Sequence, residues 1–209
     1  MGRKVVRGDA SLRGGFLFLG NHVILDFLNT RLVIDEKTTE LLPDFKAWIR
    51  WLRAAGLLEE RDVAPMKAAW DRMGRKPHPA MLVRGLRETL RADILAWEQG
   101  GAVRARTVER LNRTLQEHPM LARLRTQGSG FVTERWFRPR RTSDLFAPLA
   151  HWAMDLFVNA DPSRVRKCDN CVLHFCDASK KGQRRWCSMK MCGNRHKVWA
   201  YAERRRGKA

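Results

Sequence analysis

Hydrophobic residues recur at helical spacing along most of the chain. One stripe stands at positions i, i+3, i+4 and i+7, which form a single face of an amphipathic helix. Its members are Phe45, Trp48, Ile49 and Leu52. Gly56 follows at a position typical of a helix end. Similar stripes predict helices over residues 61–73, 79–99 and 107–117, and one that begins at Ser143 or Asp144.

The last of these stripes is the broadest. Its two adjacent rows are Leu145, Leu149, Trp152 and Leu156, and then Phe146, Ala150, Ala153 and Phe157. A helix with so wide an apolar face is typical of the centre of a domain. Residues 159–163, NADPS, then predict a short hinge. The chain is therefore expected to divide into a helical region, residues 1–160, and a small C-terminal module, residues 161–209.

Two segments depart from helical spacing. Residues 16–30, FLFLGNHVILDFLNT, predict a short strand, a Gly-Asn turn and a second strand or the start of a helix. Residues 128–141 contain FVTERWFRPRR and predict a strand or hairpin. Its arginines and aromatic residues could form a nucleic-acid surface, but aromatic packing against the helices with solvated arginines is the favoured interpretation. Residues 1–15 are polar and contain glycines, which predicts a loose N-terminus.

No membrane segment is evident along the chain. The apolar stretch from Phe16 to Leu28 is too short to span a bilayer and is interrupted by Asn21, His22 and Asp26. It also lacks the layout of a secretory signal peptide. We therefore expect a cytoplasmic protein with reduced cysteines and no membrane partner.

The charge of the chain indicates a polyanionic partner. The formal net charge is +19 and the isoelectric point is about 10.9. Residues 161–209 hold fourteen Lys and Arg against four Asp and Glu, so about half of the excess lies in the last quarter of the chain. Such a concentration of positive charge is typical of nucleic-acid binding.

The five cysteines also lie in this basic segment. Cys168 and Cys171 form a C-x2-C pair, and Cys187 and Cys192 form a C-x4-C pair fifteen residues later. Two close pairs at this separation can supply four thiolates to one tetrahedral Zn²⁺ per chain. We leave out Cys176 because a residue within a hairpin strand would need that strand to bend back to the metal.

Other interpretations of these residues remain open at this point. His174 and His196 are weaker substitutes as ligands. The thiols could instead be reduced structural residues or a redox pair, whereas a disulfide framework is not expected in a chain of this size without an export signal.

The residues around the cysteines predict a ββα module of the treble-clef or zinc-ribbon-like type. Val172–Phe175 is an apolar run, a polar turn surrounds Lys180–Gln183, and a second short run ends at Trp186. This order predicts a β-hairpin that follows the first cysteine pair. Helical spacing resumes after Cys192, so the last pair is expected where the hairpin leads into a helix.

Two motifs resemble known families. The residues RRWCS at 184–188 and CGNR at 192–195 resemble the CGNR zinc finger, although many members of that family have a longer first cysteine pair than CDNC at 168–171. Gly20, the LDF at 25–27 and the NT at 29–30 are similar to the opening of the ABATE domain, the usual companion of CGNR fingers. The resemblance implies a stress-induced transcription regulator whose helical domain senses a ligand or mediates assembly.

The helix after Cys192 predicts a division of roles. On a helical wheel, Lys197, Tyr201, Arg204 and Lys208 share one face with Asn194 close by, whereas Arg195 falls among apolar residues. The predicted nucleic-acid contacts are Lys180, Lys181, Arg184, Arg185, Asn194, Lys197, Tyr201, Arg204 and Lys208. Arg195 and Trp186 are predicted to be structural, and Asp177 is a candidate partner of Arg195.

The motifs of several enzyme classes are absent. The chain has no G-x-x-x-x-G-K-[ST], no G-x-G-x-x-G after a strand and no G-x-S-x-G, so we expect no enzyme activity. A metal-dependent nuclease with His174 as its general base is a remote alternative, because a metal closed by four thiolates has no open position. Two function classes remain: a DNA-binding transcription regulator, which is favoured, and an RNA-binding or ribosome-associated protein.

Overall fold

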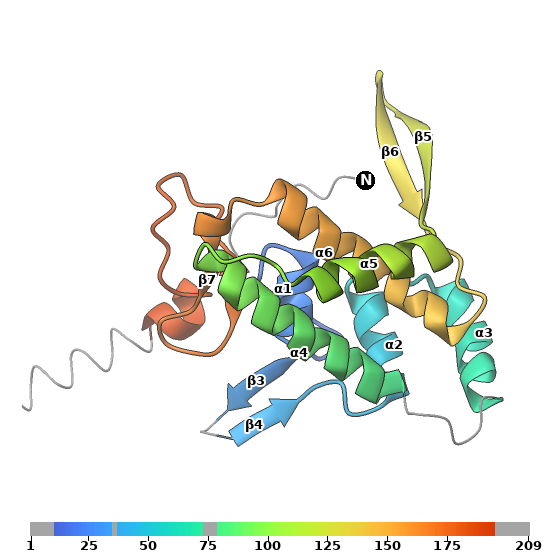
Figure 1. Ribbon diagram of the computed structural model, residues 1–209, viewed down its shortest axis with the longest axis horizontal. Helices are drawn as coiled ribbons and strands as arrows, with labels where there is room; N and C mark the ends of the chain where they lie inside the picture. Colours follow the sequence, from blue (N-terminus) through green and yellow to red (C-terminus); the bar gives the residue numbers. More distant parts are fainter. Residues whose placement is uncertain (1–10, 35–36, 73–78, 195–209) are drawn as a thin grey trace, which may run out of the picture.

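A computed structural model describes residues 11–34, 37–72 and 79–194 of the chain (Figure 1). The statements below concern these residues. The prediction for residues 1–10 and most of the predicted break at 76–79 lie outside them. None of the helices in the described ranges is long and apolar enough to cross a bilayer.

All the helices except α1 lie close to where hydrophobic spacing predicts them. They are α1 (Val23–Leu28), α2 (Phe45–Ala54), α3 (Glu60–Asp71), α4 (Pro79–Glu98), α5 (Ala105–Glu117) and α6 (Ala147–Asn159). At the start of α2, the carboxylate of Asp44 accepts a hydrogen bond of 2.8 Å from the amide of Ala47. Gly56 closes the same helix with φ of 70°, a left-handed conformation that glycine adopts without strain.

The helices enclose one main hydrophobic core. The short helix α1 contacts both α4 and α6, and α5 packs along α6 (Figure 1). All six residues of α1 are buried, and Trp48 and Trp51 of α2 are fully buried beside them. The broad apolar face of α6 is buried as predicted, with Leu149 and Leu156 inaccessible to solvent. The mainly α character of this region is confirmed.

The predicted start of α6 at Ser143 or Asp144 is wrong. Residues Thr142–Phe146 form a 3-10 helix, and α6 begins at Ala147. Pro148 explains the difference, because a proline has no N–H and fits only the first turn of an α-helix. The carboxylate of Asp144 instead accepts hydrogen bonds from the amides of Arg140 and Arg141.

Four two-stranded antiparallel hairpins accompany the helices. They are β1 (Ser11–Arg13) with β2 (Phe16–Phe18), β3 (Arg31–Ile34) with β4 (Lys37–Glu40), β5 (Leu121–Gln127) with β6 (Gly130–Trp136), and β7 (Val165–Lys167) with β8 (His174–Cys176). The predicted strand, turn and helix start over residues 16–30 are present as β2 and α1. The β3–β4 hairpin is not among the predictions.

Three predictions about strands need correction. Residues 11–13, predicted to be loose, form β1. The hairpin predicted over 128–141 begins earlier, at Leu121; all seven residues of β5 are exposed, so no alternation of apolar and polar residues marks it. In the C-terminal module, β8 pairs with β7 and not with the run that ends at Trp186, because the turn that carries the first cysteine pair folds β8 back onto β7.

Candidate metal centre

The first cysteine pair lies in the turn between β7 and β8. Cys168 follows β7 directly, and its amide donates a hydrogen bond of 2.9 Å to the carbonyl of Leu173. The register pairs Lys167 with His174, so the residues between them form a tight knuckle. Both thiols of the pair therefore project from one short turn.

The second pair lies at the start of a helical turn. Cys187 precedes Ser188, which caps a π-helical turn, Met189–Gly193, by accepting a hydrogen bond from the amide of Met191. Cys192 lies within that turn. The last cysteine pair therefore lies where the chain enters a helical turn, which is where the sequence predicts it.

The four predicted cysteines come together in one cluster. Their sulfur atoms all lie within 4.8 Å of one another, and Cys187 Sγ is 3.6 Å from both Cys171 Sγ and Cys192 Sγ. An ideal tetrahedral zinc–thiolate site has sulfur atoms about 3.8 Å apart, given Zn–S bonds of about 2.3 Å. The cluster therefore fits one zinc ion, and Cys168, Cys171, Cys187 and Cys192 are the residues that could hold it.

The electrostatics of the cluster also favour a cation. The pKa of the Cys187 thiol is raised because its sulfur lies against those of Cys168 and Cys171, and burial adds to the effect. The pKa of Cys171 is raised to about 12, mainly by the neighbouring Cys168, whereas the pKa of Cys168 is lowered by hydrogen bonds with the thiols of Cys171 and Cys187. Four thiolates cannot coexist at such distances without a compensating charge, which Zn²⁺ supplies when it binds.

Hydrogen bonds around the cysteines hold the two halves of the module together. The amide of Cys187 donates to Cys168 Sγ at 3.3 Å, and Asn170 Nδ2 donates to the carbonyl of Cys192 at 3.0 Å. Bonds of this kind orient metal ligands and stabilise thiolates. Gly193 is needed here for space, because a β-carbon would lie 2.8 Å from Met189 Sδ.

Arg184 and Asp177 support the loop that leads to Cys187. Arg184 Nε donates to the carbonyl of Trp186 at 2.7 Å, and Arg184 Nη2 donates to the carbonyl of Cys187. The buried carboxylate of Asp177 accepts hydrogen bonds from the amides of Ser179 and Arg184, at 2.9 and 2.8 Å. The sequence suggested Asp177 as a partner for Arg195, which lies outside the described residues.

His174 is buried, with 2% of its surface exposed. Within the described residues, neither ring nitrogen has a hydrogen-bond partner. Burial, together with the nearby charges of Arg91 and Lys167, lowers the pKa of His174 to about 4. A buried, neutral imidazole is poorly placed to act as the general base of a nuclease.

The predicted nucleic-acid contacts have different surroundings. Lys180, Lys181 and Asn194 are exposed, and Arg185 is exposed and pairs with Asp169 at 2.7 Å. Arg184 is half-buried and is bonded within the module, as described above. Lys197, Tyr201, Arg204 and Lys208 lie outside the described residues, as does the predicted structural residue Arg195. Trp186 is partly buried and packs against the small core that contains the cysteines, and its predicted structural role stays a prediction.

The comparison with known families agrees with this arrangement. Residues 21–160 match the ABATE family, which carries the description "Putative stress-induced transcription regulator", and residues 164–205 match the CGNR zinc finger. The chain belongs to the ABATE family. No curated protein matches it. The two matches account for the four-cysteine cluster and for the helical region that precedes it.

The motif at the opening of the ABATE domain holds the zinc finger in place. Asn29 exchanges two hydrogen bonds of 2.9 Å with the backbone of His174, one with its amide and one with its carbonyl. On the same strand, the amide of Cys176 donates to the carbonyl of Gly20 at 2.7 Å, and Asn21 Nδ2 donates to the carbonyl of Cys176. Cys176 packs against the main core of the helical region and is not part of the cluster formed by the other cysteines.

Sequence reasoning did not find these docking residues. Asp26 accepts hydrogen bonds from the amides of Leu19 and Gly20, which shapes the turn that receives β8. Leu19 and Leu32 of the helical region also share a small core with Leu173 and Phe175 of the finger. The polar residues of the motif are evident in the sequence, but the sequence does not indicate which part of the chain they contact.

Proposed function

We propose that this protein is a DNA-binding transcription regulator whose zinc finger contacts the phosphate backbone and whose helical domain senses a ligand or mediates assembly. The observation that carries the proposal is a four-cysteine cluster fitted to Zn²⁺ within the most basic part of the chain. The metal orders a short segment that has too small a core to fold alone.

The loop between β8 and Cys187 offers the clearest contact surface among the described residues. Lys180 and Lys181 lie on it with exposed side chains, and the hydrogen bonds of Asp177 and Arg164 fix its backbone. Arg164 Nη1 donates to the carbonyls of both Asp177 and Ser179. A fixed loop with two exposed ammonium groups can contact neighbouring phosphates without a large loss of entropy.

Binding of the full zinc-loaded chain to random-sequence DNA and RNA duplexes and single strands, measured by fluorescence anisotropy across a salt series, tests the proposal. We expect log K to fall linearly with log[salt], and DNA duplex to bind more tightly than RNA. Tighter binding to RNA would contradict a DNA-binding regulator and would indicate an RNA-binding protein. Affinity that does not depend on salt would contradict a phosphate-binding finger.

A pair of double variants locates the phosphate-binding surface. Lys180→Ala with Lys181→Ala should weaken binding and reduce the salt slope by about 0.9 for each phosphate that the variant no longer neutralises. Arg106→Ala with Arg110→Ala removes the same charge from an exposed part of α5 and should have a much smaller effect. Equal decreases in affinity for the two variants would show that overall charge, and not the finger, determines binding.

A further inference from the structure

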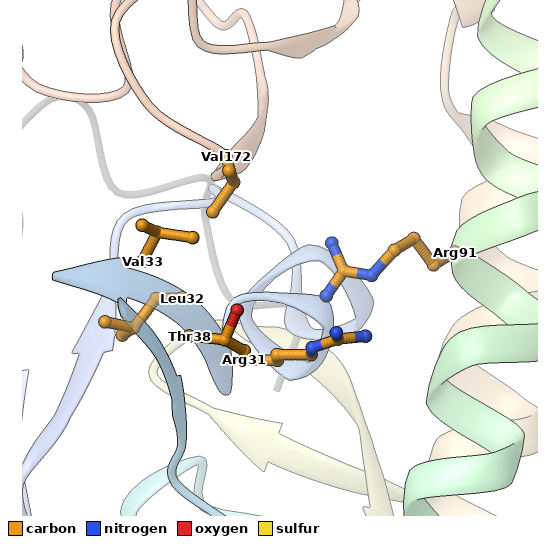
Figure 2. A pocket seen from close by; sticks show the side chains of 6 residues that line it. All are labelled: Arg31, Leu32, Val33, Thr38, Arg91 and Val172. Atoms are coloured by element: carbon orange, nitrogen blue, oxygen red, sulfur yellow. The ribbon is translucent and has the colours of Figure 1, made fainter. Parts of the chain in front are cut away.

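A small cavity lies where the zinc finger meets the helical domain. Its volume is about 180 Å³, and it is lined by Arg31, Leu32, Val33, Thr38, Arg91 and Val172 (Figure 2). The first four residues belong to the β3–β4 hairpin, Arg91 comes from α4, and Val172 comes from the knuckle beside Cys171. Three separate parts of the fold therefore build one site.

One wall of the cavity is positively charged. Figure 2 shows the guanidinium group of Arg91 reaching in from α4, with that of Arg31 beside it. Arg91 is held in place by a hydrogen bond of 2.5 Å from Nη2 to the carbonyl of Leu28, and 17% of its side chain is exposed. The Nη1 group of Arg91 and the Nη2 group of Arg31 have no partner among the described residues.

The carboxylates nearby do not neutralise this wall. Glu88 Oε2 lies 3.2 Å from Arg31 Nη1 and 3.3 Å from Arg91 Nε, and the other oxygen of Glu88 accepts from Arg87. Arg87 also pairs with Glu40. Three guanidinium groups thus share two carboxylates, which leaves one positive charge next to the cavity. Burial, together with the positive charges of Arg87 and Arg31, lowers the pKa of Arg91.

The opposite wall is apolar. Val33 and Val172 lie across the cavity from the arginines, and the buried Leu32 is next to Val33 on β3 (Figure 2). Val33 has 43% of its surface exposed, so an apolar group bound in the cavity would remove part of this surface from water. A strongly hydrated anion such as phosphate gains nothing from such a wall, whereas the aliphatic part of an organic acid does.

We propose that this cavity binds a small organic carboxylate, with its carboxylate between Arg31 and Arg91 and its aliphatic part against Val33 and Val172. Guanidinium groups match the planar carboxylate and bind it through paired hydrogen bonds. Because Val172 adjoins a cysteine of the metal cluster, the bound acid contacts the finger and the helical domain together. Binding to this site does not depend on the nucleic-acid role of the finger.

Titration of the full zinc-loaded chain with acetate, isobutyrate and isobutyramide at constant ionic strength tests the site. Methyl NMR signals of Val33 and Val172 report binding. We expect saturable shifts with isobutyrate, affinity that rises about fourfold for each added CH₂ group from acetate, and binding of the neutral amide that is weaker by about tenfold or more. Equal binding of isobutyramide, or no saturable shift with any acid, would overturn the proposal.

Variants of the charged wall and of the apolar wall test whether each of them contributes to binding of the acid. Arg31→Gln should weaken isobutyrate binding by about 10- to 100-fold, and Arg106→Gln, which removes an exposed arginine from α5, should not change it. Val33→Trp, which fills the cavity and leaves its charge intact, should abolish binding. Unchanged binding by both Arg31→Gln and Val33→Trp would contradict the site. Inorganic phosphate that shifts the same methyl signals with equal affinity would contradict the choice of a carboxylate.

Discussion

Arg184 shows how a basic residue in a basic module can serve folding. Its guanidinium group donates to the carbonyls of Trp186 and Cys187, and it lies 4.6 Å from the ring centre of Phe175. A phosphate bound to the same group would compete with these bonds. The exposed Lys180 and Lys181 are therefore better candidates for nucleic-acid contact, and charge alone does not separate the two roles.

Glu98, at the end of α4, makes the stability of the protein depend on pH. Burial raises the pKa of Glu98 from 4.5 to about 7, and Lys167 opposes the shift only in part. Its Oε2 atom has no hydrogen-bond partner among the described residues. Because the unfolded chain loses this proton at a lower pH than the folded one, the contribution of Glu98 to stability falls as pH rises from 4.5 to about 7.

We expect Glu98→Gln to raise the melting temperature at pH 8 and to change it little at pH 4. The gain should be a few degrees at most, since the side chain is only half-buried. Thermal unfolding of both proteins across this pH range measures it. Glu109→Gln, on an exposed part of α5, is the matched control. A gain at pH 4 as large as that at pH 8 would show that the effect of the substitution does not come from the charge of Glu98.

At the scale of elements, β8 connects the two parts of the chain. It pairs with β7 on one side and meets α1 and its flanking residues on the other. The two hydrogen bonds between Asn29 and His174 satisfy the buried amide and carbonyl of His174, which no strand of the described residues pairs on that side. The finger is therefore docked through backbone groups of β8 as well as through the small core that Leu173 and Phe175 share with Leu19 and Leu32.

Replacement of Asn29 by alanine should lower the free energy of unfolding by about 1–3 kcal/mol, because it leaves buried backbone groups of His174 without partners. Chemical denaturation at a fixed zinc concentration measures this change. Asn112→Ala, an exposed asparagine of α5, should leave the midpoint nearly unchanged. If Asn29→Ala unfolds at the same denaturant concentration as the unchanged protein, the docking bonds contribute nothing to stability.

The elements also show what could be predicted from the sequence. Helices with a buried stripe were located to within a few residues, since their spacing reflects one apolar environment along the whole element. The exposed strand β5 and the short strands β1 and β3 gave no such signal. The strand partner of β8 was also missed, because pairing depends on how the cysteine turn folds back and not on the residues of the strand itself.

The candidate site was predictable to a similar degree. The spacing of Cys168, Cys171, Cys187 and Cys192 identified the cluster, because each of two closely spaced cysteine pairs can supply two thiolates to the same metal ion. The roles of Asn29 and Arg184 were not predictable, because each depends on how separate segments of the chain pack in the fold. The cavity at Arg31 and Arg91 was missed for the same reason.

At the scale of the whole molecule, the finger differs from the helical domain in charge but packs against it. The largest charge excess lies in the finger, whereas its small core includes Leu19 and Leu32 of the helical domain. Metal binding at the cysteines is thus linked to the packing of the whole chain. A ligand in the cavity between Arg91 and Val172 would act on the same junction.

The most direct test of this account is the zinc content of the full chain with each cysteine replaced in turn by serine, measured by atomic emission after dialysis. The unchanged protein and Cys176→Ser should each hold one zinc ion per chain. Substitution of Cys168, Cys171, Cys187 or Cys192 should remove most of it, because three thiolates bind the metal much more weakly than four. Loss of zinc from Cys176→Ser together with retention by Cys171→Ser would contradict the assigned site.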